Sequence, residues 1–239
     1  MPTAKELIKM LMKLHNAKRA KYVAPYVGVK PGGYAEHDKL LGISVPDIRK
    51  NIKLFLGLPL NEVEKLIRSE YHEIRSAAVY ILVFQYKKLK DRKDQKRFFN
   101  FYIKNVELGY INNWDFIDIS APYITGPYLY DQENQGRTVL LKYANSPNVW
   151  LRRVGVLSTF YNIKQNEFNV MLILAEKLLN DEHHLIHKAV GWMLREIGKK
   201  EKEQLTQFLD LYGKDMPRVM LRYSIEKLSR SERDHYLGK

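Results

Sequence analysis

The chain has 239 residues, of which 45% are hydrophobic and few are glycine or proline (13 and 9), a composition that predicts one large helical domain or two small ones. Lys and Arg outnumber Asp and Glu by 40 to 27, and the formal net charge of +13 favours a polyanionic partner: nucleic acid before an anionic membrane or an acidic protein. The absence of cysteine excludes disulfides and thiolate metal sites and is typical of a reducing compartment.

The N-terminal residues 1–20 have the pattern of a basic amphipathic helix, with Leu7, Met10, Leu11 and Leu14 on one apolar stripe. They lack the apolar run of a signal peptide, and no stretch of the sequence has the length that a membrane span needs. We therefore expect a soluble cytoplasmic protein, without contact to a membrane, that is associated with the nucleoid when it binds DNA.

The one irregular region of the sequence is residues 27–45, which contain Pro31-Gly32-Gly33. We expect a long loop there, ending at Pro46, because proline suits the first turn of a helix. Further along, Asn112 is a plausible helix cap, and we expect Gly126-Pro127 to end or kink the helix that follows it.

Helical segments recur through the chain at a period of 34–40 residues. Four basic residues hold one register, Arg75, Arg153, Lys188 and Arg222, and Asp115 lies near the middle of the long gap between the first two. An amphipathic stretch precedes each unit, at residues 61–68, 94–106, 138–143, 168–179 and 204–211. This period predicts an all-α, HEAT-like repeat solenoid of antiparallel helix pairs, formed by residues 1–239 as a single domain with a basic concave face.

The recurring basic residues have two interpretations. They can line the concave face and bind phosphates, or they can solvate a surface and brace neighbouring repeats. For any one residue the sequence favours neither interpretation, but the net charge of +13 favours anion binding for the set.

Trp114 and Asp118 are the most informative pair of residues in the sequence. Their i,i+4 spacing places both side chains on one helix face, where a carboxylate lies beside an indole in a strongly basic chain. An anionic group on such a surface indicates a candidate catalytic site. The alternatives are a core tryptophan next to a surface aspartate, or an Asp118 that pairs with Arg153. Asp115 is the weaker candidate, because we expect it to share the register of the basic residues.

Several motifs of the sequence resemble the AlkD-type DNA alkylation repair proteins, a family of HEAT-like-repeat DNA glycosylases. They are the W-D-x-x-D block at 114–118, the W-L-x-R block at 150–153, the K-A-x-G-W-x-L-R-E block at 188–196, and Ala121-Pro122-Tyr123. The resemblance extends in order, with similar spacing, from about Tyr34 to the C-terminus.

The resemblance implies a monofunctional enzyme that needs no cofactor. It would excise positively charged N3- and N7-alkylated purines, such as 3-methyladenine and 7-methylguanine, from duplex DNA by hydrolysis of the N-glycosidic bond, in base excision repair. By motif, the catalytic aspartate matches Asp118, the active-site tryptophans match Trp114 and Trp192, and the concave-face arginine matches Arg153. The expected DNA-binding residues are Arg153, Lys188, Arg75, Arg222, Tyr34 and Arg152.

The chemistry of the residues agrees with this function. A cationic purine is a good leaving group and needs no strong general acid, while a carboxylate about 3 Å from the anomeric carbon stabilises the oxocarbenium ion and orients water. Trp faces pack on sugars and cationic bases, and Arg and Lys bind phosphates. The family further implies that the lesion stays largely in the duplex. We expect the protein to be a monomer.

Two further interpretations have weaker support. His183, His184 and His187 have spacings that can place two imidazoles on one helix face, but no third metal ligand has a convincing spacing. Because most solenoids are scaffolds, the alternative to a glycosylase is a non-catalytic HEAT-repeat module that binds DNA or an acidic protein.

Overall fold

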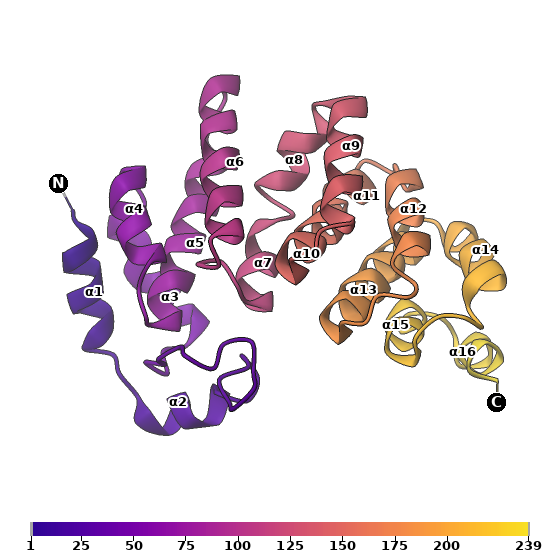
Figure 1. The fold of residues 1–239 in the computed structure, drawn as a ribbon, viewed down its shortest axis with the longest axis horizontal. Coiled ribbons are helices and arrows are strands. Elements are labelled where there is room, and N and C mark those ends of the chain that lie inside the picture. The colour runs from indigo at the N-terminus through magenta and orange to yellow at the C-terminus, as the bar shows by residue number, and fades with distance from the viewer. Residues whose placement is uncertain (1, 239) are drawn as a thin grey trace. The chain divides into compact units, whose positions relative to one another are not determined.

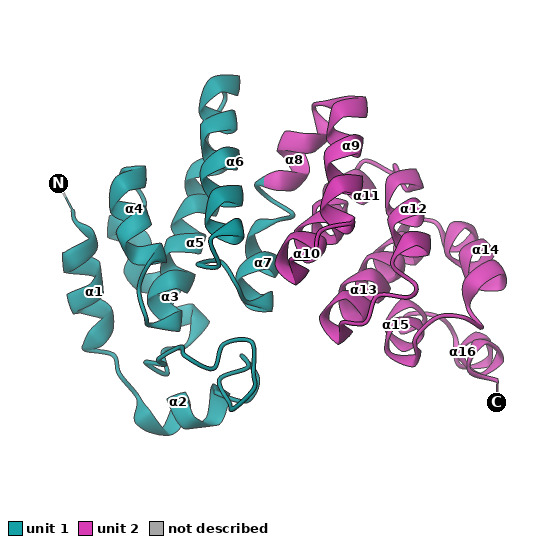
Figure 2. Ribbon diagram, viewed as in Figure 1, with its two compact units in different colours: residues 1–124 teal, residues 125–239 magenta. Residues whose placement is uncertain are grey.

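The computed structural model describes residues 2–238, and none of these lies in a β-strand (Figure 1). One isolated bridge pairs Lys39 with Tyr71. The predicted all-helical repeat fold is confirmed. The chain divides into two compact units, residues 1–124 and 125–239 (Figure 2). The single domain over residues 1–239 stays a prediction.

Unit 1 is built around α5, which packs against α3, α4 and α7. Its residues Ala77, Ala78, Ile81 and Leu82 are fully buried. The helices of unit 1 are α1 (Ala4–Met12), α2 (Ala17–Val23), α3 (Val45–Asn51), the 3-10 helix η1 (Ile52–Phe55), α4 (Leu60–Ile67), α5 (His72–Tyr86), α6 (Arg92–Glu107) and α7 (Trp114–Ser120).

Unit 2 is built around α13, which contacts α10, α12, α14 and α15. Ala189, Val190, Met193 and Leu194 of this helix are fully buried. The helices of unit 2 are α8 (Thr125–Tyr130), α9 (Glu133–Ala144), α10 (Val149–Ser158), α11 (Phe160–Lys164), α12 (Asn169–Lys177), α13 (His184–Lys200), α14 (Lys202–Tyr212), α15 (Arg218–Ser224) and α16 (Arg230–Leu237).

The predicted pairs α4–α5, α9–α10 and α12–α13 are in contact within their units. The five amphipathic stretches correspond to α4, α6, α9, α12 and α14, and each precedes the helix expected as its partner, namely α5, α7, α10, α13 and α15. Figure 1 shows α4 beside α5 and α9 beside α10, and both pairs are in contact. Within residues 2–238, every helix is too short or too polar to cross a lipid bilayer.

The register of the basic residues is confirmed in part. Arg153, Lys188 and Arg222 are each the fifth residue of their helices α10, α13 and α15. In α7 the fifth residue is Asp118, whereas Asp115 is the second. The expectation that Asp115 shares the register is therefore wrong. Asp118 precedes Arg153 by 35 residues, the same spacing that separates Arg153 from Lys188, and the longer step of 43 residues lies between Arg75 and Asp118.

Three predicted boundaries differ from the structure. Residues 1–20 do not form one helix, since α1 ends at Met12 and Asn16 caps α2 by accepting a hydrogen bond from the Arg19 amide. The cap of α7 is Asn113, one residue after Asn112. That helix ends at Ser120, so Gly126-Pro127 do not end it but lie in the first turn of α8, where a proline removes no helical hydrogen bond.

The long loop is confirmed between α2 and α3. No helix occupies residues 24–44, and α3 begins directly after it with Pro46 as its second residue. The Ser44 hydroxyl caps α3 by accepting a hydrogen bond from the Asp47 amide at 3.2 Å. The loop is thereby fixed at its end, next to the helices that form the core of unit 1.

Candidate functional site

Helix α7 presents Trp114 and Asp118 on the face that it does not bury. Phe116, Ile117 and Ser120 are fully buried on its other face, which packs against α5. Trp114 and Asp118 are half-buried. Their i,i+4 spacing keeps the two side chains on one side of the helix, so Trp114 is not a core residue, in contrast to Trp150, which is only 7% exposed.

The start of α7 is hydrogen-bonded to the turn that follows α2. The Trp114 indole Nε1 donates a hydrogen bond to the carbonyl of Tyr26 at 3.0 Å. The neighbouring Asn113, which is fully buried, donates from its side-chain amide to the carbonyl of Val27 at 2.8 Å. These two bonds fix the indole ring relative to the loop that follows α2.

Asp118 lies in a pocket of about 500 Å³ that sequence reasoning did not find. The pocket is lined by three cations, three aromatic residues, Asp118 and several aliphatic residues, which lie on or next to α3, η1, α5 and α7. The cations are Arg49, Lys53 and Lys87, and the aromatic residues are Tyr80, Phe84 and Tyr123. One carboxylate thus lies among three cations and several apolar rings, a combination that suits a phosphate-bearing sugar.

Two of these cations already rest against aromatic rings. Lys87 Nζ is 3.9 Å from the centroid of the Tyr123 ring, and the Arg49 guanidinium is 6.0 Å from that of Tyr80. Cation–π contacts of this kind hold a cation at an apolar wall. A sequence signal was present, because Arg49 and Lys53 are four residues apart and Tyr80, Phe84 and Lys87 follow helical spacing, but none of them is in the repeat register.

Asp115 has a structural partner instead. It accepts a hydrogen bond from Nε2 of the buried His72 at 2.8 Å, and Nδ1 of His72 is 3.0 Å from Asp38. Burial lowers the pKa of His72, but the negative charge of Asp115 and the hydrogen bonds to Asp115 and Asp38 outweigh that effect and raise it to about 9. The imidazolium therefore joins the long loop, α5 and α7.

Arg75 belongs to the same buried cluster. Its side chain is 6% exposed, it forms an ion pair with Asp38, and it donates to Asn112 Oδ1 at 2.9 Å and to the Tyr110 carbonyl at 3.3 Å. A guanidinium engaged in this way is unavailable to phosphates. These contacts favour the interpretation in which Arg75 braces neighbouring elements of the fold, and Arg75 is not among the proposed DNA contacts.

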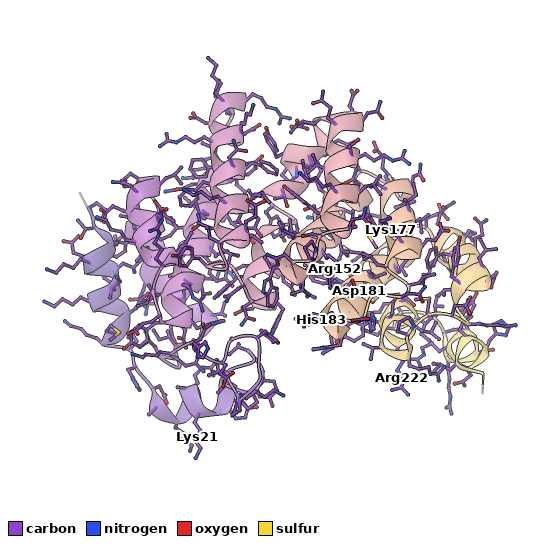
Figure 3. The ribbon with its side chains drawn as sticks, viewed as in Figure 1. Lys21, Arg152, Lys177, Asp181, His183 and Arg222 are labelled. Carbon is purple, nitrogen blue, oxygen red and sulfur yellow. The ribbon has the colours of Figure 1, made fainter. Side chains whose placement is uncertain are left out.

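Arg152 and Arg153 also hold unit 2 together. Arg152 lies beside Asp181 (Figure 3) and forms a two-pronged ion pair with it, at 2.7 and 3.3 Å. It also donates to the carbonyls of Ser146 and Pro147. Arg153 is 4% exposed and donates to the carbonyl of Leu185, in the first turn of α13. Arg152 therefore braces unit 2 and is not a free cation. Arg153 also braces unit 2 through its hydrogen bond to Leu185.

Trp192 is half-buried on α13, where Glu196 and Phe160 lie beside its ring. The indole Nε1 donates to Glu196 Oε1 at 3.0 Å, and the ring centroid of Phe160 is 6.5 Å away. The preceding Gly191 allows α13 and α15 to approach closely, since a Cβ there would lie 2.5 Å from the carbonyl oxygen of Met220. The glycine of the K-A-x-G-W block thus has a packing role.

The two remaining cations of the register are available for binding. No hydrogen bond or ion pair joins Lys188 or Arg222 to another residue of the described chain. Lys188 is half-buried, whereas Arg222 is exposed and lies at the surface of unit 2 (Figure 3). Of the four basic residues that the period singled out, these two keep the anion-binding interpretation without a competing structural contact.

Tyr34 packs inside the long loop. Its ring lies against Gly28, where a Cβ would come within 2.6 Å of the ring and where the φ of +79° favours glycine. The residue whose backbone contacts Trp114 is instead Tyr26, which has an exposed ring and was not singled out by the sequence.

The histidines at the start of α13 take part in capping. His183 Nδ1 accepts a hydrogen bond from the Leu185 amide at 3.1 Å, and His187 Nε2 contacts the Asp181 carbonyl. Among residues 2–238, no three His, Asp or Glu side chains are arranged so that they could hold a metal ion.

A pocket of about 590 Å³ in unit 2 suits DNA less well than the pocket at Asp118. It lies among α8, α9, α11 and α12, and its charged lining residues are Asp131, Glu133, Glu167 and Arg137. Three carboxylates against one guanidinium repel a polyanion. We therefore place the candidate site at Asp118.

Comparison with known proteins agrees with these features. The family model described as DNA alkylation repair enzyme matches residues 7–228. Among solved structures, the chain is similar to one titled predicted DNA alkylation repair enzyme from Enterococcus faecalis, with a TM-score of 0.71 and 16% sequence identity over 90% of this chain and 97% of that one. At this identity the structural likeness concerns the fold. No curated protein matches the chain.

Proposed function

Because the chain belongs to the DNA alkylation repair enzyme family, we propose that it is a monofunctional DNA glycosylase for cationic alkylated purines. Membership of the family gives the protein a role in DNA alkylation repair. The proposed reaction is hydrolysis of the N-glycosidic bond of N3- and N7-alkylated purines in duplex DNA. The observation that supports it most is Asp118, on the same helix face as Trp114 and inside a pocket with three cations.

Asp118 is the proposed catalytic residue. When the bond between the purine and C1′ of the deoxyribose breaks, its electron pair moves to the base and neutralises the positive charge of the alkylated ring. The sugar then carries oxocarbenium character, which a carboxylate stabilises. Water adds to C1′ and gives up a proton, which Asp118 accepts. The leaving base needs no proton, so no second carboxylic acid is required.

The neighbouring residues supply binding. In unit 1, we assign the indole face of Trp114 to the sugar or base, and Arg49, Lys53 and Lys87 to phosphates. In unit 2, we assign Trp192 to the active site and Lys188 and Arg222 to phosphates. Arg153, which matches the concave-face arginine of the family by motif, is also kept as a proposed DNA-binding residue. The partner is duplex DNA, the protein acts as a monomer, and the reaction uses no cofactor.

The experiment that tests the function is release of 7-methylguanine from methylated duplex DNA. We expect the wild type to release the base and Asp118→Asn, which keeps the size but removes the charge, to release it roughly 10–1,000-fold more slowly, as expected when one electrostatic stabiliser is removed. Duplex affinity should hold or rise, because an anion beside phosphates is removed.

The outcomes separate the two classes of function. A wild type that binds duplex DNA but releases no alkylated base supports the non-catalytic binding module. A folded Asp118→Asn variant that releases the base at the wild-type rate removes Asp118 from the mechanism. The residual rate of the variant is expected to be measurable, since a cationic base also leaves unaided on a slow timescale.

A further inference from the structure

Helix α6 is unusual because its first half lies outside the core of unit 1. The helix has 16 residues, and its buried residues, Tyr102, Ile103, Asn105 and Val106, all belong to its second half. Residues 92–101 are exposed or half-buried. Figure 1 shows α6 extending beyond the neighbouring α4 and α5. The first half of α6 therefore contributes little to the packing of the protein itself.

Four cations lie along the exposed face of α6. Lys93, Arg97 and Lys104 are separated by four and seven residues, which are spacings that keep side chains on one side of a helix, and Lys96 lies beside them. All four residues are exposed. At about 1.5 Å per residue they span about 16 Å of the helix axis. We call these four residues the α6 cation row.

The fold does not use the charge of the α6 cation row. No side-chain hydrogen bond or ion pair joins a member of the row to another residue in the part of the chain that the structure describes. Helix stability does not explain the row, because Lys93 lies in the first turn, where the helix macrodipole disfavours positive charge. The acidic residues of α6 are Asp94, on another side of the helix, and Glu107, in its last turn. The charge of the row is therefore available to an anionic partner.

The surroundings of the α6 cation row favour a phosphate backbone as that partner. The phenylalanines of α6, Phe98, Phe99 and Phe101, are all half-buried. Protein interfaces usually need exposed aromatic or aliphatic anchors and are depleted of lysine, and a membrane-surface helix needs an exposed apolar face. Nucleic-acid backbones, in contrast, are bound by Lys and Arg without apolar anchors.

The α6 cation row also lies outside the candidate site. The pocket at Asp118 is lined by residues on or next to α3, η1, α5 and α7, and α6 supplies none of them. The row begins at the end of α6 that is remote from α7, since Lys93 precedes Glu107 by about 21 Å along the helix axis. Duplex DNA is stiff over about 150 base pairs, so a short duplex at Asp118 cannot wrap around unit 1 to reach a second surface.

We propose that the α6 cation row binds the phosphate backbone of a second segment of duplex DNA while the first segment is held at Asp118. The inference rests on the proposed function, because that function makes duplex DNA the partner. With two such surfaces, one protein molecule passes directly from one DNA segment to another without first dissociating into solution. Direct transfer of this kind shortens the search for a rare lesion.

The test compares a variant of the row with a matched control. The row variant replaces three of its cations: Lys93→Gln, Lys96→Gln and Arg97→Gln. The control removes the same charge from three exposed positions of unit 2: Lys142→Gln, Lys177→Gln and Lys214→Gln. Because all six side chains are exposed, thermal unfolding of both proteins should match that of the wild type.

The measurement is capture of a second duplex. Monomeric protein, checked by light scattering, is loaded on a short immobilised duplex that holds a stable abasic-site analogue, and capture of a fluorescent undamaged duplex is followed as a function of salt. Four phosphate contacts give the wild type and the control a log–log slope of about −3.6, and the row variant should lose about 2.7 of that slope and most of the captured duplex. Release of 7-methylguanine from a short duplex should be equal for all three proteins, because α6 does not contact the reacting groups.

The outcomes separate this inference from the proposed function. If the row variant captures the second duplex like the wild type, the inference is overturned and the glycosylase function stands. If capture depends on the row but no base is released, the inference stands and the glycosylase function fails.

Two other results also overturn the inference. If the row variant loses binding to the single short duplex, the row belongs to the surface that holds the lesion. If the row is needed for binding to phosphatidylglycerol vesicles but not for capture of DNA, it is a lipid-binding surface.

Discussion

Two aspartates one helical turn apart in α7 have different roles. Asp115 accepts a hydrogen bond from His72, whose side chain is 5% exposed, whereas Asp118 lines a pocket with three cations. The sequence placed both residues on one short helix and favoured Asp118 through the motif, but the reason it gave against Asp115, a shared register, was wrong. The partner of Asp115 lies 43 residues away in the sequence, so only the folded structure could identify it.

The first prediction concerns Asp115→Asn. This change leaves the protonated His72 with a weaker partner inside the protein, so we expect the free energy of unfolding to fall by about 1–3 kcal/mol. Urea unfolding at pH 7 measures this. The matched Asp118→Asn should retain the wild-type stability while its excision slows. A stable Asp115→Asn variant with the larger decrease in excision would exchange the two roles.

At the scale of helices, the buried cluster of Asp38, His72, Arg75 and Asp115 connects the long loop to α5 and α7. The Glu73 carboxylate reinforces the connection, because it accepts hydrogen bonds from the amides of Leu41 and Gly42 at 2.8 and 2.7 Å. The long loop that follows α2 is therefore positioned by charged groups rather than by apolar packing alone. This makes its attachment sensitive to pH.

The second prediction follows from the raised pKa of His72, which is about 9 in the folded protein against an ordinary value of 6.5. A raised pKa stabilises the fold fully below about pH 6.5, and this stabilisation disappears as the pH rises through 9. Its size is about 3 kcal/mol. Urea unfolding between pH 6.5 and 9.5 should show the decline, and His72→Gln should flatten it. A wild-type curve parallel to that of His72→Gln would contradict the raised pKa.

The helix pairs could be predicted from sequence because their period repeats and their apolar residues follow helical spacing. Helix α2 could not be predicted from the sequence, because it has no buried face and therefore no apolar stripe that marks it as a separate helix. The cations at Asp118 were missed for a related reason. Arg49 and Lys53 are on α3 and η1, outside the 34–40 residue period, and become neighbours of Asp118 only when α3, α5 and α7 pack together.

At the scale of the whole chain, the 40 Lys and Arg residues that give the net charge of +13 have two kinds of role. Some brace the fold, and others remain available to bind anions. Arg75 and Arg152 are bonded to carboxylates, whereas Lys188 and Arg222 are not. The composition indicated a polyanionic partner, but it could not indicate which cations the fold itself would use. Counting charges therefore overestimates the number that can bind phosphates.

The third prediction is the salt dependence of duplex binding. The five phosphate contacts assigned under the proposed function, by Arg49, Lys53, Lys87, Lys188 and Arg222, contribute about −4.5 to the log–log slope, so that affinity should fall by roughly 500-fold or more between 50 and 200 mM salt. Fluorescence anisotropy of a labelled duplex measures the slope. Arg222→Gln should reduce it by about 0.9, while Arg152→Gln should leave it unchanged and lower the thermal stability. Equal slopes for the wild type and Arg222→Gln would remove Arg222 from the DNA contacts.

The bond between the Trp114 indole and the Tyr26 carbonyl also gives the protein an optical reporter. The chain has three tryptophans, and the half-buried Trp114 has its ring nitrogen fixed by that bond. In a Trp150→Phe, Trp192→Phe variant, all tryptophan emission comes from Trp114. We expect DNA to quench that emission as bases or sugars cover the ring. Loss of the hydrogen bond to the Tyr26 carbonyl should instead shift the emission to longer wavelength. Stopped-flow measurements would then time the arrival of DNA at the helix that carries Asp118.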